Sequence, residues 1–244
     1  MIIASEGIVL RTIKYSDSSV ISKIYTREKG MLSFLIQGIY SKRAAIKPSM
    51  LQPLQPLELH FYFHQNKTLF KIKELRPSVI LNNLHYDLNR SSIAVFMAEL
   101  INKSIQEEET HPAMYDFLMK SILMLDSLPS SLANFPLFFL LEYSKLLGFY
   151  PNNNYAPETA CFELHQGMFT HESDDDSYFV LPPASEYLGR MLDTSFEQFD
   201  TLSIPKQIRQ LLLKKLIAYY QIHLHGFRNL NSLQVLEDMY VGLK

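Results

Sequence analysis

The feature that most constrains this chain is a series of strand-like segments in its first eighty residues, separated mostly by short polar turns. The clearest is 57–64, where Leu57, Leu59 and Phe61 alternate with Glu58 and His60, as in a strand with one buried and one solvated face. Five short strands joined in this way favour a small closed barrel, and the OB-fold is the commonest barrel of that strand count. The predicted strands are 8–15, 20–26, 31–37, 57–64 and 68–75.

Details of the first three strands add two expectations. In the first strand, alternation places Val9, Arg11 and Ile13 on one face. Between the second and third strands, Gly30 is placed to supply the positive φ that a hairpin loop needs. After the third strand the chain enters a basic loop, residues 39–48.

From residue 82 the apolar period becomes helical. The segment 135–147 is apolar almost all round and predicts a buried central helix, which Gly148 ends and Pro151 keeps from resuming. The first predicted helix is followed by an acidic run at 107–109. The predicted helices are 93–105, 114–125, 135–147, 205–225 and 231–240.

An insertion of different character interrupts the helices at 152–183. Short strands are expected at 161–164, 168–170 and 178–181, with an acidic loop at 172–176. The predicted fold class is therefore α+β and multidomain. It has an OB-fold barrel at 1–80 and a helical bundle at 81–244 that carries this small β-type insertion.

Positive charge is concentrated in the predicted barrel. Residues 1–80 carry twelve Lys or Arg and five Asp or Glu, a net charge of +7, whereas the whole chain has −2, which leaves −9 for the rest. Such asymmetry suggests a polyanion partner for the basic part. The alternative, that these cations only solvate a small β-domain, stays open at this stage.

Composition and motifs restrict the remaining classes. A hydrophobic fraction of 47% and an aromatic fraction of 12% indicate a folded core. The single cysteine, Cys161, fits a reducing compartment, and neither a signal peptide nor a membrane span is recognisable, so a cytoplasmic location is expected. No phosphate loop, HExxH, GxSxG or paired-cysteine motif is present, and His223 and His225 are badly spaced for chelation on a helix, so we expect no enzyme and no cofactor.

The pattern GIVLRTIKYSDSSVISKIYTREKGMLSFLIQGIYSKR resembles the start of the RecO family of bacterial recombination mediators. The resemblance continues through LQPLQPLELHFYF and the segment 72–75, and resumes more weakly at 219–232. It implies a non-enzymatic protein that binds single- and double-stranded DNA, anneals complementary strands, and works with RecR to help RecA replace single-strand binding protein. It also implies a location at the nucleoid.

Many RecO-like proteins carry zinc in the insertion, bound by a CxxC…CxxC set. Here only Cys161 remains, Leu164 stands where the second cysteine is expected, and nothing near 178–183 replaces the other pair. Because a structural zinc site needs about four ligands, we predict no metal. A substitute set of His165, His171 and the aspartates at 174–176 is the less favoured alternative.

The resemblance and the charge pattern together nominate DNA contacts in the barrel. Phosphate neutralisation would dominate their affinity and make it salt-dependent. Three cations within six positions, beside Tyr40, make the basic loop the principal candidate; Tyr40 either stacks on a base or packs against the barrel. The predicted DNA-binding residues are Arg11, Lys14, Lys23, Arg27, Lys29, Tyr40, Lys42, Arg43, Lys47, Lys71 and Lys73.

The helical part is expected to bind proteins. In RecO-like proteins it receives the acidic, Phe-ending tail of single-strand binding protein, and basic groups beside apolar ones suit that ligand. The candidates here are Lys206, Arg209, Lys214 and Lys215. For any single one of them, the favoured alternative is that its charge only solvates a helix face. A further alternative is that the barrel is a scaffold acting mainly through RecR and single-strand binding protein, with weak DNA binding.

Overall fold

The computed structural model describes residues 1–105, 110–129, 132–171 and 177–242. The acidic run at 107–109 and the acidic loop at 172–176 lie outside these residues. The chain divides into two compact units, Met1–Ser127 and Leu128–Lys244, so two helices group with the barrel in the first unit. The predicted division at residue 80 follows the change from strands to helices, and it stays a prediction about independently folding domains.

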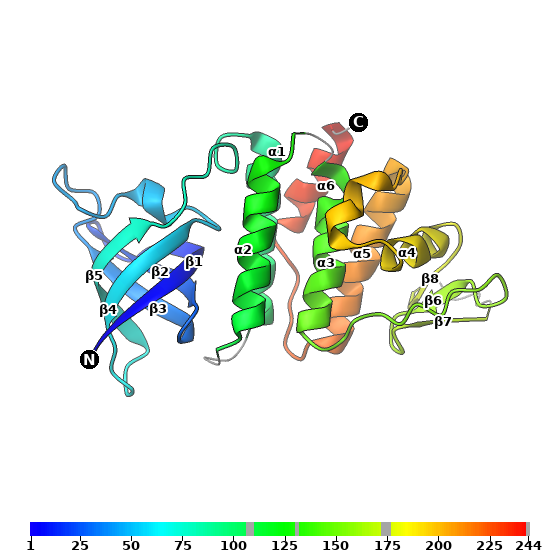
Figure 1. The fold of residues 1–244 in the computed structure, drawn as a ribbon, viewed down its shortest axis with the longest axis horizontal. Coiled ribbons are helices and arrows are strands. Elements are labelled where there is room, and N and C mark those ends of the chain that lie inside the picture. The colour runs from blue at the N-terminus through cyan, green and yellow to red at the C-terminus, as the bar shows by residue number, and fades with distance from the viewer. Residues whose placement is uncertain (106–109, 130–131, 172–176, 243–244) are drawn as a thin grey trace. The chain divides into compact units, whose positions relative to one another are not determined.

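The first unit contains a closed five-stranded barrel (Figure 1). Its strand order is β1-β2-β3-β5-β4, with β4 returning to β1, and β3–β5 is its one parallel pair. This is the OB-fold, so the predicted fold is confirmed. The strands are β1 (Ile2–Lys14), β2 (Ser19–Thr26), β3 (Gly30–Gln37), β4 (Pro56–Tyr62) and β5 (Leu69–Pro77).

Strand β1 differs from its prediction in two ways. It begins six residues earlier, because its first half pairs with β4, a partner about fifty residues away that local pattern does not reveal. It also has a bulge: Val9 pairs with Ile24, but Arg11 already pairs with Lys23. Val9 therefore lies in the core while Arg11 and Ile13 face outward, so the single face predicted for these three residues was wrong.

The barrel core follows the period-two pattern of the other strands. Leu57, Leu59 and Phe61 are essentially buried, as predicted, and Phe61 packs edge-on against Phe34 at 5.1 Å between ring centres. Gly30 has a φ of +61° at the β2–β3 turn, which confirms its predicted role.

Two helices complete the first unit, α1 (Leu88–Ser104) and α2 (Pro112–Ser127). The segment between β5 and α1 is fixed by Asp126, near the end of α2. Its carboxylate accepts hydrogen bonds from the backbone N–H groups of Asn82, Asn83 and Leu84 at 3.1, 2.8 and 2.7 Å. One buried side chain thus holds the exit from the barrel.

The second unit is mainly helical. As predicted, α3 is buried almost all round, and Gly148, with a φ of +86°, follows its end. The short elements α4 and η3 are not among the predicted ones. The elements are η2 (Leu132–Asn134), α3 (Phe135–Leu146), α4 (Ala184–Leu192), η3 (Phe196–Thr201), α5 (Lys206–His223) and α6 (Leu233–Gly242).

The insertion forms a small antiparallel sheet of order β7-β6-β8, close to the predicted strands. The strands are β6 (Cys161–Glu163), β7 (Met168–Thr170) and β8 (Phe179–Val180). Aromatic packing joins this sheet to α5, since Phe162 contacts Phe169 at 5.1 Å and Tyr219 at 5.9 Å between ring centres. His223 Nε2 donates to the Leu164 carbonyl at 2.8 Å.

Among the residues that the structure describes, every helix is too short or too polar to cross a bilayer.

Candidate nucleic-acid interface

Two predicted DNA contacts lie side by side on the outer face of the barrel. Arg11 of β1 and Lys23 of β2 occupy facing positions, and no described residue forms an ion pair with either. Partial burial lowers the pKa of Lys23, and the charge of Arg11 lowers it further. Two facing cations repel each other, so this strand cation pair, Arg11 and Lys23, is a place where an anion would be stabilising.

The barrel register extends this surface to β5. Lys71 is exposed and pairs across the parallel β3–β5 ladder with Leu35 of β3, while Leu35 pairs with Ile21 of β2. The register therefore brings the strand cation pair and Lys71 together around the outer face of β2 and β3, although Lys71 lies 48 residues after Lys23 and 60 after Arg11. Lys14 lies at the end of β1, where an ion pair with Asp17 at 3.2 Å partly offsets its charge.

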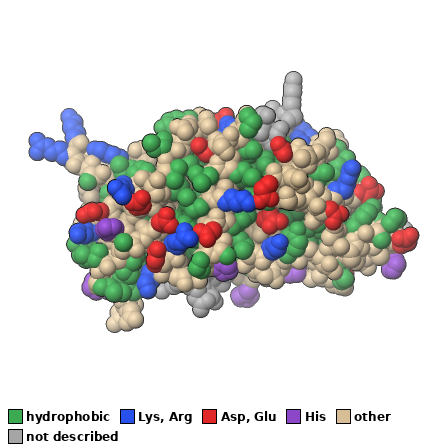
Figure 2. Space-filling view, in the orientation of Figure 1, with side chains coloured by type: hydrophobic (Ala, Val, Ile, Leu, Met, Phe, Trp, Pro, Cys, Tyr) green, Lys and Arg blue, Asp and Glu red, His purple; other side chains and the backbone are tan. Residues whose placement is uncertain are grey.

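The basic loop, residues 39–48, leaves β3 next to the β1–β2 turn, because the Ile39 N–H donates to the Ser18 carbonyl at 3.2 Å. Tyr40 is 54% exposed, and its stacking on a base stays a prediction. Lys42 and Arg43 are exposed, and Lys47 Nζ donates to the Lys42 carbonyl at 3.1 Å, a hydrogen bond within the loop. In Figure 2, Lys and Arg side chains project where Figure 1 draws this loop.

Two predicted DNA contacts have other partners within the first unit. Arg27 forms ion pairs with Glu6 at 3.0 Å and with Asp116 of α2 at 2.8 Å, and its guanidinium lies 5.2 Å from the centre of the Tyr115 ring. This arrangement ties α2 to the barrel. Lys29 lies over the ring of Phe63 at 5.1 Å. Their positive charge follows from sequence, but these partners come from distant segments and could not be predicted.

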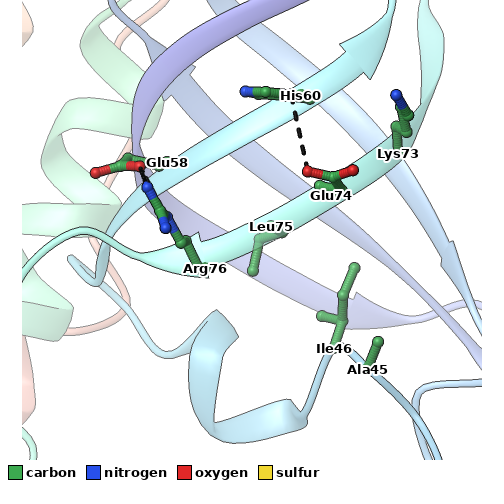
Figure 3. A pocket seen from close by; sticks show the side chains of 8 residues that line it. All are labelled: Ala45, Ile46, Glu58, His60, Lys73, Glu74, Leu75 and Arg76. Carbon is green, nitrogen blue, oxygen red and sulfur yellow. Dashed lines mark hydrogen bonds and ion pairs between the residues drawn. The ribbon is translucent and has the colours of Figure 1, made fainter.

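Lys73 lies on a different part of the barrel surface. It lines a hollow of about 470 Å³ with Ala45, Ile46, Glu58, His60, Glu74, Leu75 and Arg76. Figure 3 shows that Arg76 turns to Glu58 and His60 to Glu74; Arg76 Nε lies 2.8 Å from Glu58 Oε2, and His60 Nδ1 lies 3.9 Å from Glu74 Oε2. Two carboxylates in this hollow make it a poor place for a phosphate.

The four α5 cations do not form one open basic face. Arg209 is only 8% exposed and donates to the Ile204 carbonyl at 2.6 Å. Lys214 lies 3.7 Å from Glu237 of α6, and Lys215 Nζ donates to the Ser177 carbonyl at 3.4 Å. Lys206 is half-buried near the start of the helix. Recognition of an acidic tail by these residues stays a prediction.

The insertion contains the residues that the sequence offers as alternative zinc ligands. Cys161 is buried, Leu164 is buried, His165 lies against the Tyr178 ring, and His171 Nδ1 donates to the Glu158 carbonyl at 3.0 Å. In the described part of the chain, no three His, Cys, Asp or Glu side chains are placed to hold a metal ion together. The aspartates at 174–176 lie outside that part.

A closed OB barrel with outward-facing cations, followed by a helical region with a small β insertion, defines this chain as an OB-fold protein of mixed architecture. Family comparisons identify the class more closely. The family model for the N-terminal part of recombination protein O matches residues 1–79, and the model for its C-terminal part matches residues 85–234. The chain belongs to the RecO family of DNA repair proteins, which confirms the resemblance seen in its sequence.

Individual relatives match along nearly their whole length. DNA repair protein RecO of Flavobacterium psychrophilum is 34% identical over 246 residues, which cover 98% of this chain and all of that protein. The protein of the same name from Phocaeicola vulgatus is 32% identical over 234 residues, which cover 96% and 97%.

Proposed function

We propose that this protein is a non-enzymatic, DNA-binding recombination mediator. In this proposal it binds and anneals single-stranded DNA and, with RecR, helps RecA load onto strands coated by single-strand binding protein. The proposal is supported above all by the strand cation pair. Arg11 and Lys23 face each other on the barrel surface without a carboxylate partner among the described residues, as expected if a phosphate supplies the missing charge.

The basic loop extends the proposed interface. Its exposed Lys42 and Arg43 and the exposed ring of Tyr40 can follow a mobile strand, while the strand cation pair is held by the barrel. Because these contacts are to phosphates, they do not distinguish one sequence from another. An annealing protein needs that property, since it must accept any pair of complementary strands.

Binding of a labelled single-stranded oligonucleotide, measured at several salt concentrations, tests this proposal. Arg11→Gln with Lys23→Gln should lower the affinity and reduce the slope of log K against log salt by about 1.4, at about 0.7 for each lost phosphate contact. Reversing Lys42, Arg43 and Lys47 to Glu should reduce it further. The matched control removes two exposed helix cations, by Lys120→Gln with Lys145→Gln, and should leave the slope unchanged.

Strand annealing is measured on the same variants, with complementary oligonucleotides whose pairing quenches a fluorophore. The wild type should accelerate pairing and the strand-pair variant should do so less. Equal slopes for the wild type and the strand-pair variant would remove the main support for the proposal.

A second candidate function is a scaffold that acts mainly through protein contacts. One observation favours it: Ile80, Tyr86 and Leu88, around the start of α1, are 82%, 85% and 80% exposed. Large apolar side chains that are exposed together commonly mark an interaction surface. Adding RecR to the DNA titration separates the candidates, because a scaffold would bind DNA only weakly by itself and more tightly when RecR is present.

A further inference from the structure

An apolar row crosses the outer face of the barrel. Ile13 of β1 pairs with Ile21 of β2, and Ile21 pairs with Leu35 of β3, so the three side chains stand next to one another across three strands. Ile13 is 45% exposed, and the other two are half-buried. Elsewhere on β2, the outward-facing Tyr25 is buried against Tyr115 of α2, whereas Ile13 in this row stays exposed.

Cations flank this row on two sides. Two residues along the strands, about 7 Å away, lies the strand cation pair, Arg11 and Lys23. At the end of the row, Leu35 is followed across the β3–β5 ladder by Lys71. A ligand that lies on the row would thus meet apolar surface in its middle and positive charge along its side and end.

We propose that Ile13, Ile21 and Leu35 form a contact surface for the unpaired bases of single-stranded DNA, whose phosphates are neutralised by Arg11, Lys23 and Lys71. The inference rests on the proposed function and deepens it, because it assigns to this face a contact that only single-stranded DNA can make. Unpaired bases expose their faces, which can pack on apolar side chains, whereas the bases of a duplex are stacked on one another. The row therefore adds affinity only for unpaired DNA.

An acidic peptide with apolar side chains has related chemistry, but the barrel suits it less well. Peptides that bind sheets usually add a strand to a free edge and gain main-chain hydrogen bonds. Here Ile21 of β2 and Leu35 of β3 each have a paired strand on both sides, so they offer no such edge. Only the Ile13 end of β1 lacks a second partner, because β1 pairs with β4 over Ile2–Ile8 alone. The row spans about 10 Å across three strands, a length suited to a few bases.

The test uses the full-length protein and three DNA probes of equal length: an oligothymidine strand, the same strand with its central bases replaced by abasic sites, and a duplex. The wild type should bind the abasic strand more weakly than oligothymidine, with a similar salt slope. Ile13→Ser with Leu35→Ser should weaken oligothymidine binding about tenfold, leave duplex binding unchanged, and remove the difference between the oligothymidine and abasic strands. Leu123→Ser, a change at a 41% exposed leucine on α2, is the matched control and should change none of these values.

The outcomes separate the two proposals. If the wild type binds DNA with a steep salt slope but does not distinguish abasic from normal strands, the base-contact surface is refuted and the DNA-binding function stands; this comparison needs no variant and so does not depend on folding of the double mutant. If the wild type binds none of the three probes, the function itself fails. If Ile13→Ser with Leu35→Ser leaves DNA binding intact but abolishes binding of an acidic, Phe-ending peptide, the row is a protein-docking surface and the inference is overturned.

Discussion

Replacing Asp126 by alanine should destabilise the first unit by about 3 kcal/mol. The carboxylate accepts three backbone N–H groups, of which that of Leu84 is buried and those of Asn82 and Asn83 belong to exposed residues. A hydrogen bond to a charged group contributes about 1.5–3 kcal/mol, and a buried donor left without an acceptor costs about as much. We therefore assign about 2 kcal/mol to the Leu84 bond and about 0.5 kcal/mol to each bond that water can replace.

Thermal unfolding followed by circular dichroism measures this effect. A loss of about 3 kcal/mol should lower the melting temperature of the first unit by about 10 °C. Asp17→Ala is the control, because it also removes a carboxylate of the first unit but only from an exposed ion pair with Lys14, and it should shift the melting temperature little.

The pH dependence of this difference is a second readout. Burial raises the pKa of Asp126, but the hydrogen bonds from Asn83, Leu84 and Asn82 and the charge of Arg90 outweigh it and leave the pKa below its ordinary value. A group with a depressed folded pKa contributes stability above its unfolded pKa, and that contribution is lost as the pH falls through the folded pKa. The gap between wild type and Asp126→Ala should thus be full at neutral pH and narrow in acid. A gap that is absent at pH 7, or that persists unchanged in strong acid, would refute the reasoning.

Two other changes test the fold. Gly7→Ala places a Cβ 2.7 Å from Ile24 Cγ2 and 2.9 Å from Leu59 Cδ2, so overpacking should destabilise the barrel by about 1–3 kcal/mol. Urea denaturation measures this loss, and unaltered stability would contradict the close packing around Gly7. Treatment with a chelator should leave the melting temperature unchanged, because aromatic contacts among Phe162, Phe169 and Tyr219 join the insertion to α5. Stoichiometric zinc in the purified protein, or a lower melting temperature after chelation, would contradict this expectation.

The strands of the barrel could be predicted because their information is local. Alternation in 57–64 and Gly30 at a turn depend on neighbours in sequence, and the structure agrees with both. The bulge after Val9 could not be predicted, because it depends on how β1 pairs with β2. That one extra residue turns Arg11 and Ile13 away from the core side on which Val9 lies, and so it creates the outer surface on which the proposed interface depends.

The charged residues of the candidate site could be predicted from the sequence, but their arrangement in space and their partners could not. Sequence shows that Arg11, Lys23 and Arg27 are cations in a basic segment, yet it treats them alike. The structure gives Arg27 the carboxylates of Glu6 and Asp116, the latter from a helix nearly ninety residues away, and gives Arg11 and Lys23 no such partner among the described residues. The apolar row was missed for a related reason. Ile13, Ile21 and Leu35 read as ordinary strand residues until the register places them together on the outer face.

The strand cation pair and the basic loop should contribute differently to DNA affinity, because their cations are held in different ways. Arg11 and Lys23 lie on paired strands, and their mutual repulsion already costs the free protein some stability. A phosphate placed between them would relieve that repulsion without ordering any backbone, so binding there loses little conformational entropy. Lys42 and Arg43 are exposed on a loop, and fixing them on DNA costs rotamer and backbone freedom. The strand cation pair should therefore contribute more to affinity per charge, whereas the basic loop extends the interface to strands that approach in different directions.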